Sequence, residues 1–251
     1  MKVRLKTKEE IERIHEAGRI LAECHREIAK MIGPGITTLE IDAFVETFLE
    51  KRGATAEQKG YNGFPYATCA SINDVVCHGF PGKQKLAPGD IVTIDIVVGK
   101  NGWMADSGWS YRIGQVSDEA EKLLTTTERA LLAGIAEAVP GKKIGDIGYA
   151  VQRVAQAARI GIVKPLIGHG IGRAMHEAPD VPNFGRPRSG VTLQPGMVIT
   201  IEPIFTGGDT GAVLWEDDGW TIRTADGSLG AHYEHTLAIT EDGPLVLTDG
   251  K

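Results

Sequence analysis

One pattern occurs twice in this chain of 251 residues. LAPGDIVTIDI at 86–96 and LQPGMVITIEP at 193–203 each join Leu-x-Pro-Gly to a β-branched run and then an acidic residue, at an offset of 107 positions. MIGPGITTLEI at 31–41 and EAVPGKKIGDI at 137–147 match at an offset of 106. Two matches in the same order at nearly the same offset predict one domain that is built from two related halves.

Each predicted half begins with helices and continues into strands. Thr7 to Glu10 form a capping-box pattern, followed by apolar residues at helical spacing. A second helix is expected to end near Gly53 and to carry Leu39, Ile41, Phe44, Val45, Phe48 and Leu49. Two more are expected from Glu119 to about Val139 and from Asp146 to Ala158. Helices followed by antiparallel strands indicate an α+β fold. The halves are expected at about 8–115 and 116–245, in a single catalytic domain that spans 1–251.

Charge and apolar content limit the partners of the chain. It carries 27 Lys and Arg against 33 Asp and Glu, a net charge of −6, which argues against a nucleic acid or an anionic membrane held by bulk electrostatics. The charged N-terminal segment lacks the apolar stretch of a signal peptide, and no apolar run approaches the roughly 18 residues of a membrane span. The three cysteines form no CxxC pair, so we expect a cytoplasmic protein without a disulfide framework.

The segment 90–114 predicts a β-hairpin that carries two acidic residues, Asp95 and Asp106. A turn at Lys100-Asn101 would place them directly opposite each other, whereas a turn at Asn101-Gly102, the stronger hairpin signal, would make them diagonal neighbours. Both registers keep the two carboxylates on one face. That face is also expected to carry four uncharged neighbours, Ile91, Thr93, Val97 and Trp109. A cation between the acids therefore explains the pattern better than a solvated charged surface.

Two histidines and two further acids extend this candidate site. The stretch GHGIGRAMHEAP at 168–179 holds histidines seven positions apart, among glycines that let backbone approach a site closely. Glu202 ends the β-rich run VITIE, and Glu234 lies in AHYEHTLAIT. With the hairpin pair and His169 they form a set of four carboxylates and one imidazole. Such a set suits Mn²⁺, Fe²⁺, Co²⁺ or Zn²⁺ and can hold two ions about 3.5–4 Å apart.

The rival chemistry is a cysteine–histidine nucleophile at Cys77 and His78. Adjacent residues on a strand point to opposite faces, so we expect these two side chains to be badly placed to pair.

Five motifs in order resemble the type I methionine aminopeptidase family. They are NDVVCHGFPG at 73–82, DIVTID with ADSG at 90–95 and 105–108, GHGIGRAMHE at 168–177, TIEP at 200–203 and YEHT at 233–236. The resemblance covers essentially the whole chain and implies the pita-bread fold, whose two related halves would explain the repeat. It also implies removal of the initiator methionine from nascent proteins and peptides with a small second residue, by hydrolysis with a water activated by two divalent ions.

The resemblance also implies a role for each matching residue. Asp95 and Glu234 would bind one ion, His169 and Glu202 the other, with Asp106 and Glu234 bridging. Glu202 would act as general base toward the attacking water. The remaining matches would contact substrate, namely the histidines His78 and His176 and the methionine-pocket residues Tyr61, Phe64, Cys69 and Trp220. The chain departs from the common family pattern at Met175, Ile204 and Trp103-Met104, none of which removes a ligand.

The residues leave two alternatives open. One is a proline-specific aminopeptidase P or prolidase of the same fold, a class that usually carries an extra N-terminal domain. The other is a metal-free binding protein on the same scaffold, against which the intact ligand set argues. For the methionine enzyme, the expected partners are chains with N-terminal methionine and, transiently, the ribosome. We expect the enzyme to act as a monomer.

Overall fold

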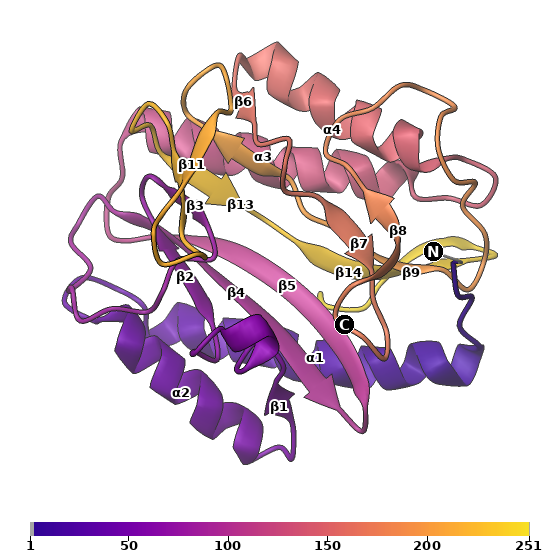
Figure 1. The fold of residues 1–251 in the computed structure, drawn as a ribbon, viewed down its shortest axis with the longest axis horizontal. Helices are drawn as coiled ribbons and strands as arrows, with labels where there is room; N and C mark the ends of the chain where they lie inside the picture. The colour runs from indigo at the N-terminus through magenta and orange to yellow at the C-terminus, as the bar shows by residue number, and fades with distance from the viewer. Residues whose placement is uncertain (1–2, 251) are drawn as a thin grey trace.

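The computed structural model describes residues 3–250, and within that range four α-helices form two pairs (Figure 1). The first pair is α1 (Lys8–Met31) and α2 (Thr38–Glu50), and the second is α3 (Asp118–Glu137) and α4 (Ile144–Ala158). Figure 1 shows the two pairs on opposite sides of the strands. All four predicted helices are present. No helix within 3–250 is long and apolar enough to cross a membrane.

Capping boxes begin the helices α1 and α2. At α1 the Thr7 side chain accepts the Glu10 N–H at 3.2 Å, and the Glu10 carboxylate accepts the Thr7 N–H at 3.0 Å. Thr37 and Glu40 repeat this capping box at α2. Both arrangements satisfy backbone donors that the first helical turn leaves free.

The strands pair in antiparallel fashion in four sheets, which confirms the α+β prediction. The first-half sheet consists of β1 (Thr55–Ala56), β4 (Ile91–Lys100) and β2 (Cys69–Ile72), with β5 (Trp103–Arg112) also paired to β4. The largest second-half sheet has the order β15 (Gly243–Val246), β14 (His235–Thr240), β9 (Val198–Ile201), β7 (Gly168–Gly170) and β8 (Glu177–Val181). Two smaller sheets are β13 (Gly230–His232), β10 (Ile204–Thr206) and β6 (Gly161–Ile162), and β11 (Val213–Trp215), β12 (Ile222–Thr224) and β3 (Val75–Cys77). A short 3₁₀ helix covers Tyr61–Gly63.

The two halves repeat the same backbone contacts. Gly35 N–H donates to the Leu86 carbonyl at 2.8 Å, and Gly141 N–H donates to the Leu193 carbonyl at 3.0 Å. Isolated bridges join Thr37 with Lys85 and Lys143 with Thr192, at the same offsets of 106 and 107 positions. One apolar cluster lies mainly between α1, α2 and the β4–β5 hairpin and also contains Val198 and Ala238 of the second half, and another lies mainly between α3, α4, β9 and β14. The repeated sequence segments therefore make the same backbone contacts in both predicted halves.

The β4–β5 hairpin turns at Asn101-Gly102, the second of the two predicted registers. Lys100 pairs with Trp103, and both turn residues have positive φ, 51° at Asn101 and 75° at Gly102. Asparagine and glycine tolerate that conformation, which suits the twist of a two-residue hairpin. Asp95 consequently lies opposite Gly108, and Asp106 lies opposite Val97, so the two acids are diagonal neighbours on one face.

The prediction that Trp109 shares this face is wrong. Trp109 pairs with Ile94, one position from Asp95, and alternation along the strand directs its side chain to the other face. There its ring stacks on His25 of α1 at a centroid distance of 5.5 Å. Trp109 therefore joins the first half's core and leaves the acidic face open.

Candidate active site

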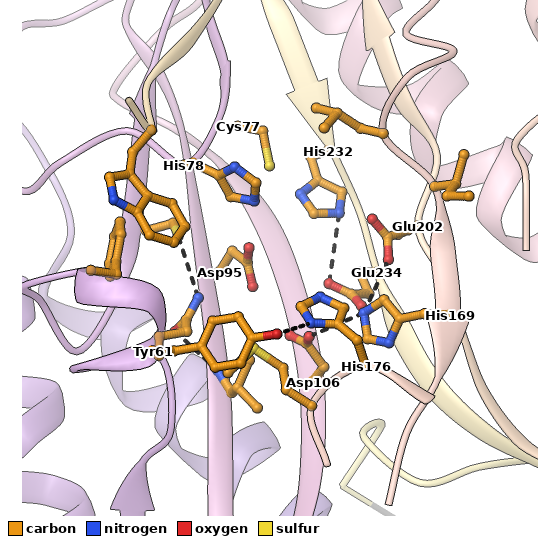
Figure 2. Close-up of a pocket in the computed structure, with 18 of the residues that line it drawn as sticks. Tyr61, Cys77, His78, Asp95, Asp106, His169, His176, Glu202, His232 and Glu234 are labelled. Atoms are coloured by element: carbon orange, nitrogen blue, oxygen red, sulfur yellow. Dashed lines mark hydrogen bonds and ion pairs between the residues drawn. The ribbon is translucent and has the colours of Figure 1, made fainter. Parts of the chain in front are cut away.

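One cavity of about 360 Å³ lies between the two halves. It is lined by residues of the first half around β2, β3, β4 and β5 and by residues of the second half between 165 and 234 (Figure 2). Among its lining residues are all eleven that the sequence singled out: Tyr61, Phe64, Cys69, His78, Asp95, Asp106, His169, His176, Glu202, Trp220 and Glu234.

The five predicted ligands come from five different segments. Asp95 lies on β4, Asp106 on β5 and His169 on β7, whereas Glu202 directly follows β9 and Glu234 lies between β13 and β14. Their side chains converge at the floor of the cavity (Figure 2). The His169 Nε2 atom is 3.8 Å from Asp106 Oδ2 and 3.7 Å from Glu202 Oε1.

Hydrogen bonds hold the His169 and Glu202 side chains in this arrangement. The Thr200 hydroxyl accepts the His169 backbone N–H at 3.0 Å and donates to Glu202 Oε1 at 2.9 Å. The His169 Nδ1–H donates to the Gly170 carbonyl at 2.9 Å, because a carbonyl can only accept. The Nε2 lone pair of His169 is therefore left to face the acids, as in histidines that bind metals.

Hydrogen bonds between the halves align Asp106 and Glu234. Thr236 Oγ1 accepts the Asp106 N–H at 2.9 Å and donates to the Asp106 carbonyl at 2.8 Å. The Glu234 N–H donates to the Gly108 carbonyl at 2.8 Å, and Ser107 Oγ donates to the Glu234 carbonyl at 2.9 Å. These bonds fix Glu234 of the second half against the strand that carries Asp106.

Three of the buried carboxylates are incompletely hydrogen-bonded by the described part of the protein. Within residues 3–250, one oxygen each of Asp95, Asp106 and Glu234 is buried without a hydrogen-bond partner. Burial raises the pKa of Asp95 to about 6 and that of Glu202 to about 8. Burial and the neighbouring negative charges raise the pKa of Asp106 and Glu234 well above the ordinary carboxyl range. A bound cation would offset the free-energy cost of burying these carboxylates, because it neutralises their charges and accepts their free lone pairs.

The residues present therefore fit a divalent-metal centre. Donor atoms of Asp106, His169 and Glu234 lie within 4.8 Å of one another, and all three side chains are buried. Carboxylate oxygens and a single imidazole form a donor set that borderline divalent ions accept.

Apolar side chains form the part of the cavity beside Asp95. Cys69 on β2 pairs with Asp95 in the register of the sheet and is buried, as is Phe64. The Phe64 and Trp220 rings meet edge to face, with centroids 5.0 Å apart. This pocket offers rings and sulfur and would suit an unbranched apolar side chain.

The two histidines of the glycine-rich stretch have different environments. His169 is buried among the acids, whereas His176 lies at the exposed rim with its ring centroid 4.3 Å from that of His169. Tyr61, also on the rim, contacts His176 through a hydrogen bond of 2.9 Å between its hydroxyl and Nδ1 (Figure 2). His78 is half-buried and meets the Trp220 ring at 5.9 Å.

The expectation that Cys77 and His78 face opposite sides is wrong. Strand β3 ends at Cys77, and His78 has a positive φ of 54°, so the chain turns there and both side chains line the cavity. Burial raises the pKa of the Cys77 thiol well above its ordinary value and lowers the pKa of His78 to about 4. A thiolate nucleophile is disfavoured in this environment, because the reactive form of cysteine is the anion.

His232 is a residue of the cavity that none of the sequence motifs had indicated. Its ring lines the cavity and is buried, and its Nε2 atom is 3.7 Å from Glu234 Oε2 (Figure 2). The signal was present in AHYEH, where His232 precedes Glu234 by two positions, the spacing that places side chains on one face of an extended chain.

The three departures from the family pattern leave the ligands in place. Met175 is buried and lines the cavity. Ile204 is fully buried in a small apolar cluster with Val163 and Ile222. Trp103 is covered by the guanidinium of Arg173, 4.4 Å from its ring centroid.

Comparison with known proteins agrees with this geometry. Residues 12–241 match the model of metallopeptidase family M24. Methionine aminopeptidase 1 of Bacillus subtilis is 44% identical to this chain over 243 residues, which cover 97% of this chain and 98% of that protein. A methionine aminopeptidase of Clostridium perfringens is 46% identical over 244 residues, which also cover 97% of this chain and 98% of that protein. The crystal structure of methionine aminopeptidase from Rickettsia prowazekii superposes with a TM-score of 0.96 at 37% identity, covering 98% of this chain and 100% of that one.

The proline-specific alternative has weaker support. Prolidase from Pyrococcus furiosus superposes with a TM-score of 0.76 at 24% identity, and only 65% of its chain is covered. That likeness shows a shared fold alone. The much higher identity to the methionine enzymes extends over nearly the whole of both chains and confirms the pita-bread fold. The chain belongs to metallopeptidase family M24 and, within it, to the methionine aminopeptidases.

Proposed function

We propose that this chain hydrolyses the peptide bond after an N-terminal methionine when the second residue is small, with two divalent ions as cofactors. The observation that carries the proposal is the convergence of Asp95, Asp106, His169, Glu202 and Glu234 at the floor of one cavity that also has an apolar pocket. Initiator methionine on nascent chains is the matching natural substrate.

Asp95 would help to hold one ion, His169 and Glu202 the other, and Asp106 and Glu234 would contribute to both. Ions bound there would polarise the scissile carbonyl and lower the pKa of the attacking water. Glu202 would take the proton of that water, with its carboxylate oriented by the Thr200 hydroxyl. The apolar pocket of Phe64, Cys69 and Trp220 would hold the methionine side chain.

His176 would donate a hydrogen bond to the carbonyl oxygen of the scissile bond. A neutral imidazole that accepts the Tyr61 hydroxyl at Nδ1 carries its proton on Nε2, which leaves that N–H as a donor toward substrate. Partial burial lowers the pKa of His176 and so favours the neutral ring. His78 would contact the substrate from its position beside Trp220.

Removal of divalent ions is expected to silence the enzyme. Loss of the ions forfeits several kcal/mol of transition-state stabilisation, which corresponds to roughly a 1,000-fold fall in kcat/KM. The measurement is hydrolysis of Met-Ala-Ser after exhaustive chelation, with elemental analysis of the same sample, followed by return of Mn²⁺ or Co²⁺. Acid should act in the same direction, because protons compete with metal for the ligands. Full turnover by protein that is metal-free by elemental analysis would contradict the proposal.

The apolar pocket predicts selectivity for methionine. A charged side chain placed against Phe64, Cys69 and Trp220 would lose its hydration without gaining a partner. We therefore expect kcat/KM for Lys-Ala-Ser and Asp-Ala-Ser to be lower than for Met-Ala-Ser by at least about 100-fold. Hydrolysis of Ala-Pro peptides is measured in the same assay to test the proline-specific alternative. Equal cleavage of the lysine and methionine peptides would show that the pocket is assigned wrongly, and a preference for Ala-Pro would favour a prolidase.

Nascent chains as substrates would place the enzyme in the cytoplasm, in transient contact with the ribosome. We propose that residues 1–251 act there as one catalytic domain and as a monomer, because one cavity of this chain contains every residue assigned a role.

A further inference from the structure

A second imidazole points into the acidic floor of the cavity. His232, at the end of β13, is 2% exposed, and its Nε2 atom is buried without a hydrogen-bond partner among residues 3–250. Figure 2 shows the ring directed toward Glu234. The distance from His232 Nε2 to Glu234 Oε2 is 3.7 Å, which is too long for a hydrogen bond.

This separation matches that of the predicted ligand pairs. His169 Nε2 lies 3.7 Å from Glu202 Oε1 and 3.8 Å from Asp106 Oδ2, the same spacing that His232 keeps from Glu234. Two atoms that each lie about 2.1 Å from one ion, at an angle of about 90–125°, are roughly 3.0–3.7 Å apart. The spacing therefore suits a shared cation.

The donor atoms divide into two groups. One contains Asp106, His169 and Glu234, and the other contains Cys77, Asp95 and His232, with the atoms of each group within 4.8 Å of one another. The second group also holds a carboxylate oxygen of Asp95 that is buried without a partner within 3–250. The predicted five-ligand set has its single imidazole in the first group, and His232 supplies one for the second.

The fold holds the His232 ring in place. Ser110 Oγ accepts the His232 N–H at 3.1 Å and donates to its carbonyl at 2.9 Å. The ring packs on Gly108, where an added Cβ would lie 3.0 Å from Cε1 and 3.1 Å from Nδ1. Its position is therefore set before any ion binds, as a metal ligand requires.

We propose that His232 Nε2 is a further ligand of this centre and binds the ion held by Asp95. The proposal rests on the two-ion site of the proposed function and gives each ion one imidazole. An added nitrogen donor shifts the preference of the Asp95 position toward Co²⁺, Fe²⁺ or Zn²⁺ and away from ions that prefer oxygen alone.

The test uses Co²⁺-loaded protein and the proton NMR signals of its ligated histidines, which the paramagnetic ion shifts far from the normal range. We expect two shifted imidazole sets in the wild-type protein, from His169 and His232. His232→Gln should remove one set and weaken the affinity for the second Co²⁺, measured by calorimetric titration, by at least about 10-fold. Glutamine keeps a hydrogen-bond donor, so a histidine that merely oriented Glu234 would be largely replaced by it.

His78→Gln is the matched control, because it removes another imidazole from the same cavity. Both shifted sets should persist in that variant. A single set in the wild-type protein, or loss of the second set in His78→Gln instead of His232→Gln, would overturn the proposal. Circular dichroism tests whether each variant is folded. If His232→Gln is not folded, His232→Ala serves as the second variant.

The same samples separate this inference from the proposed function. If Co²⁺ binds, a single imidazole set appears and Met-Ala-Ser is still hydrolysed, then only the role of His232 is wrong. If the wild-type protein binds no Co²⁺ at all, the two-ion centre itself is wrong.

Discussion

Glu202→Gln is expected to abolish turnover while the fold is retained. Glutamine has nearly the same volume, and its carbonyl oxygen can still accept the Thr200 hydroxyl that now bonds Glu202 at 2.9 Å. It cannot take a proton from water and is a weaker ligand than a carboxylate. Loss of general-base catalysis alone typically costs 10²- to 10⁴-fold, roughly, in rate. Because ligation is weakened as well, we expect the upper part of that range.

The measurement pairs kcat on Met-Ala-Ser with the metal content of the same preparation. Glu216→Gln is the matched control, since it makes the same exchange at an exposed glutamate that pairs with Arg223 on the surface. That variant should behave as wild type. A near-normal kcat for Glu202→Gln, with both ions bound, would contradict the assignment of Glu202 as the base.

His169→Ala and His176→Ala are expected to fail in different ways, although the two residues are seven positions apart. His169 is buried, donates through Nδ1 to the Gly170 carbonyl and directs Nε2 at Asp106 and Glu202. Its loss should reduce metal stoichiometry or affinity. His176 lies at the rim and contacts Tyr61 rather than the acids. Its loss should leave the metal in place and lower kcat by about 10²- to 10³-fold, the usual cost of removing one hydrogen bond to a developing oxyanion.

The test of this division of roles is to measure the metal content and kcat of the two variants side by side. Tyr61→Phe adds a graded test, because it removes the hydroxyl that orients His176 and leaves the acids untouched. We expect it to keep its metal and to lose less activity than His176→Ala. If His176→Ala loses metal as readily as His169→Ala, or loses no activity, the division of roles is wrong.

Features that depend on neighbouring residues could be predicted from the sequence alone. Thr7 and Glu10 cap α1 because their side chains reach the backbone of the same turn. Asp95 and Asp106 share a face because side chains alternate along each strand and the two-residue turn pairs odd-numbered positions of β4 with even-numbered positions of β5. The repeat was readable because each Pro-Gly segment begins the same local arrangement, and the structure repeats the Gly35–Leu86 contact at Gly141–Leu193.

Features that depend on distant segments needed the tertiary structure. His78 turns into the cavity only because β3 ends at Cys77, where its pairing with β12 stops. His232 reaches the acids because Ser110 and Gly108, more than 120 residues away, fix its backbone and accommodate its ring. No local pattern encodes such contacts, since chain folding decides which strands meet.

The sequence by itself therefore determined the helices, the repeat, the hairpin face and, through ordered motifs, the residues of the cavity. The tertiary structure decided the burial of Trp109 against His25 and the position of the His232 ring against Gly108. Side-chain direction within one element follows from backbone geometry that neighbouring residues set. The convergence of five segments from two halves into one buried, charged site follows only from how those halves pack together.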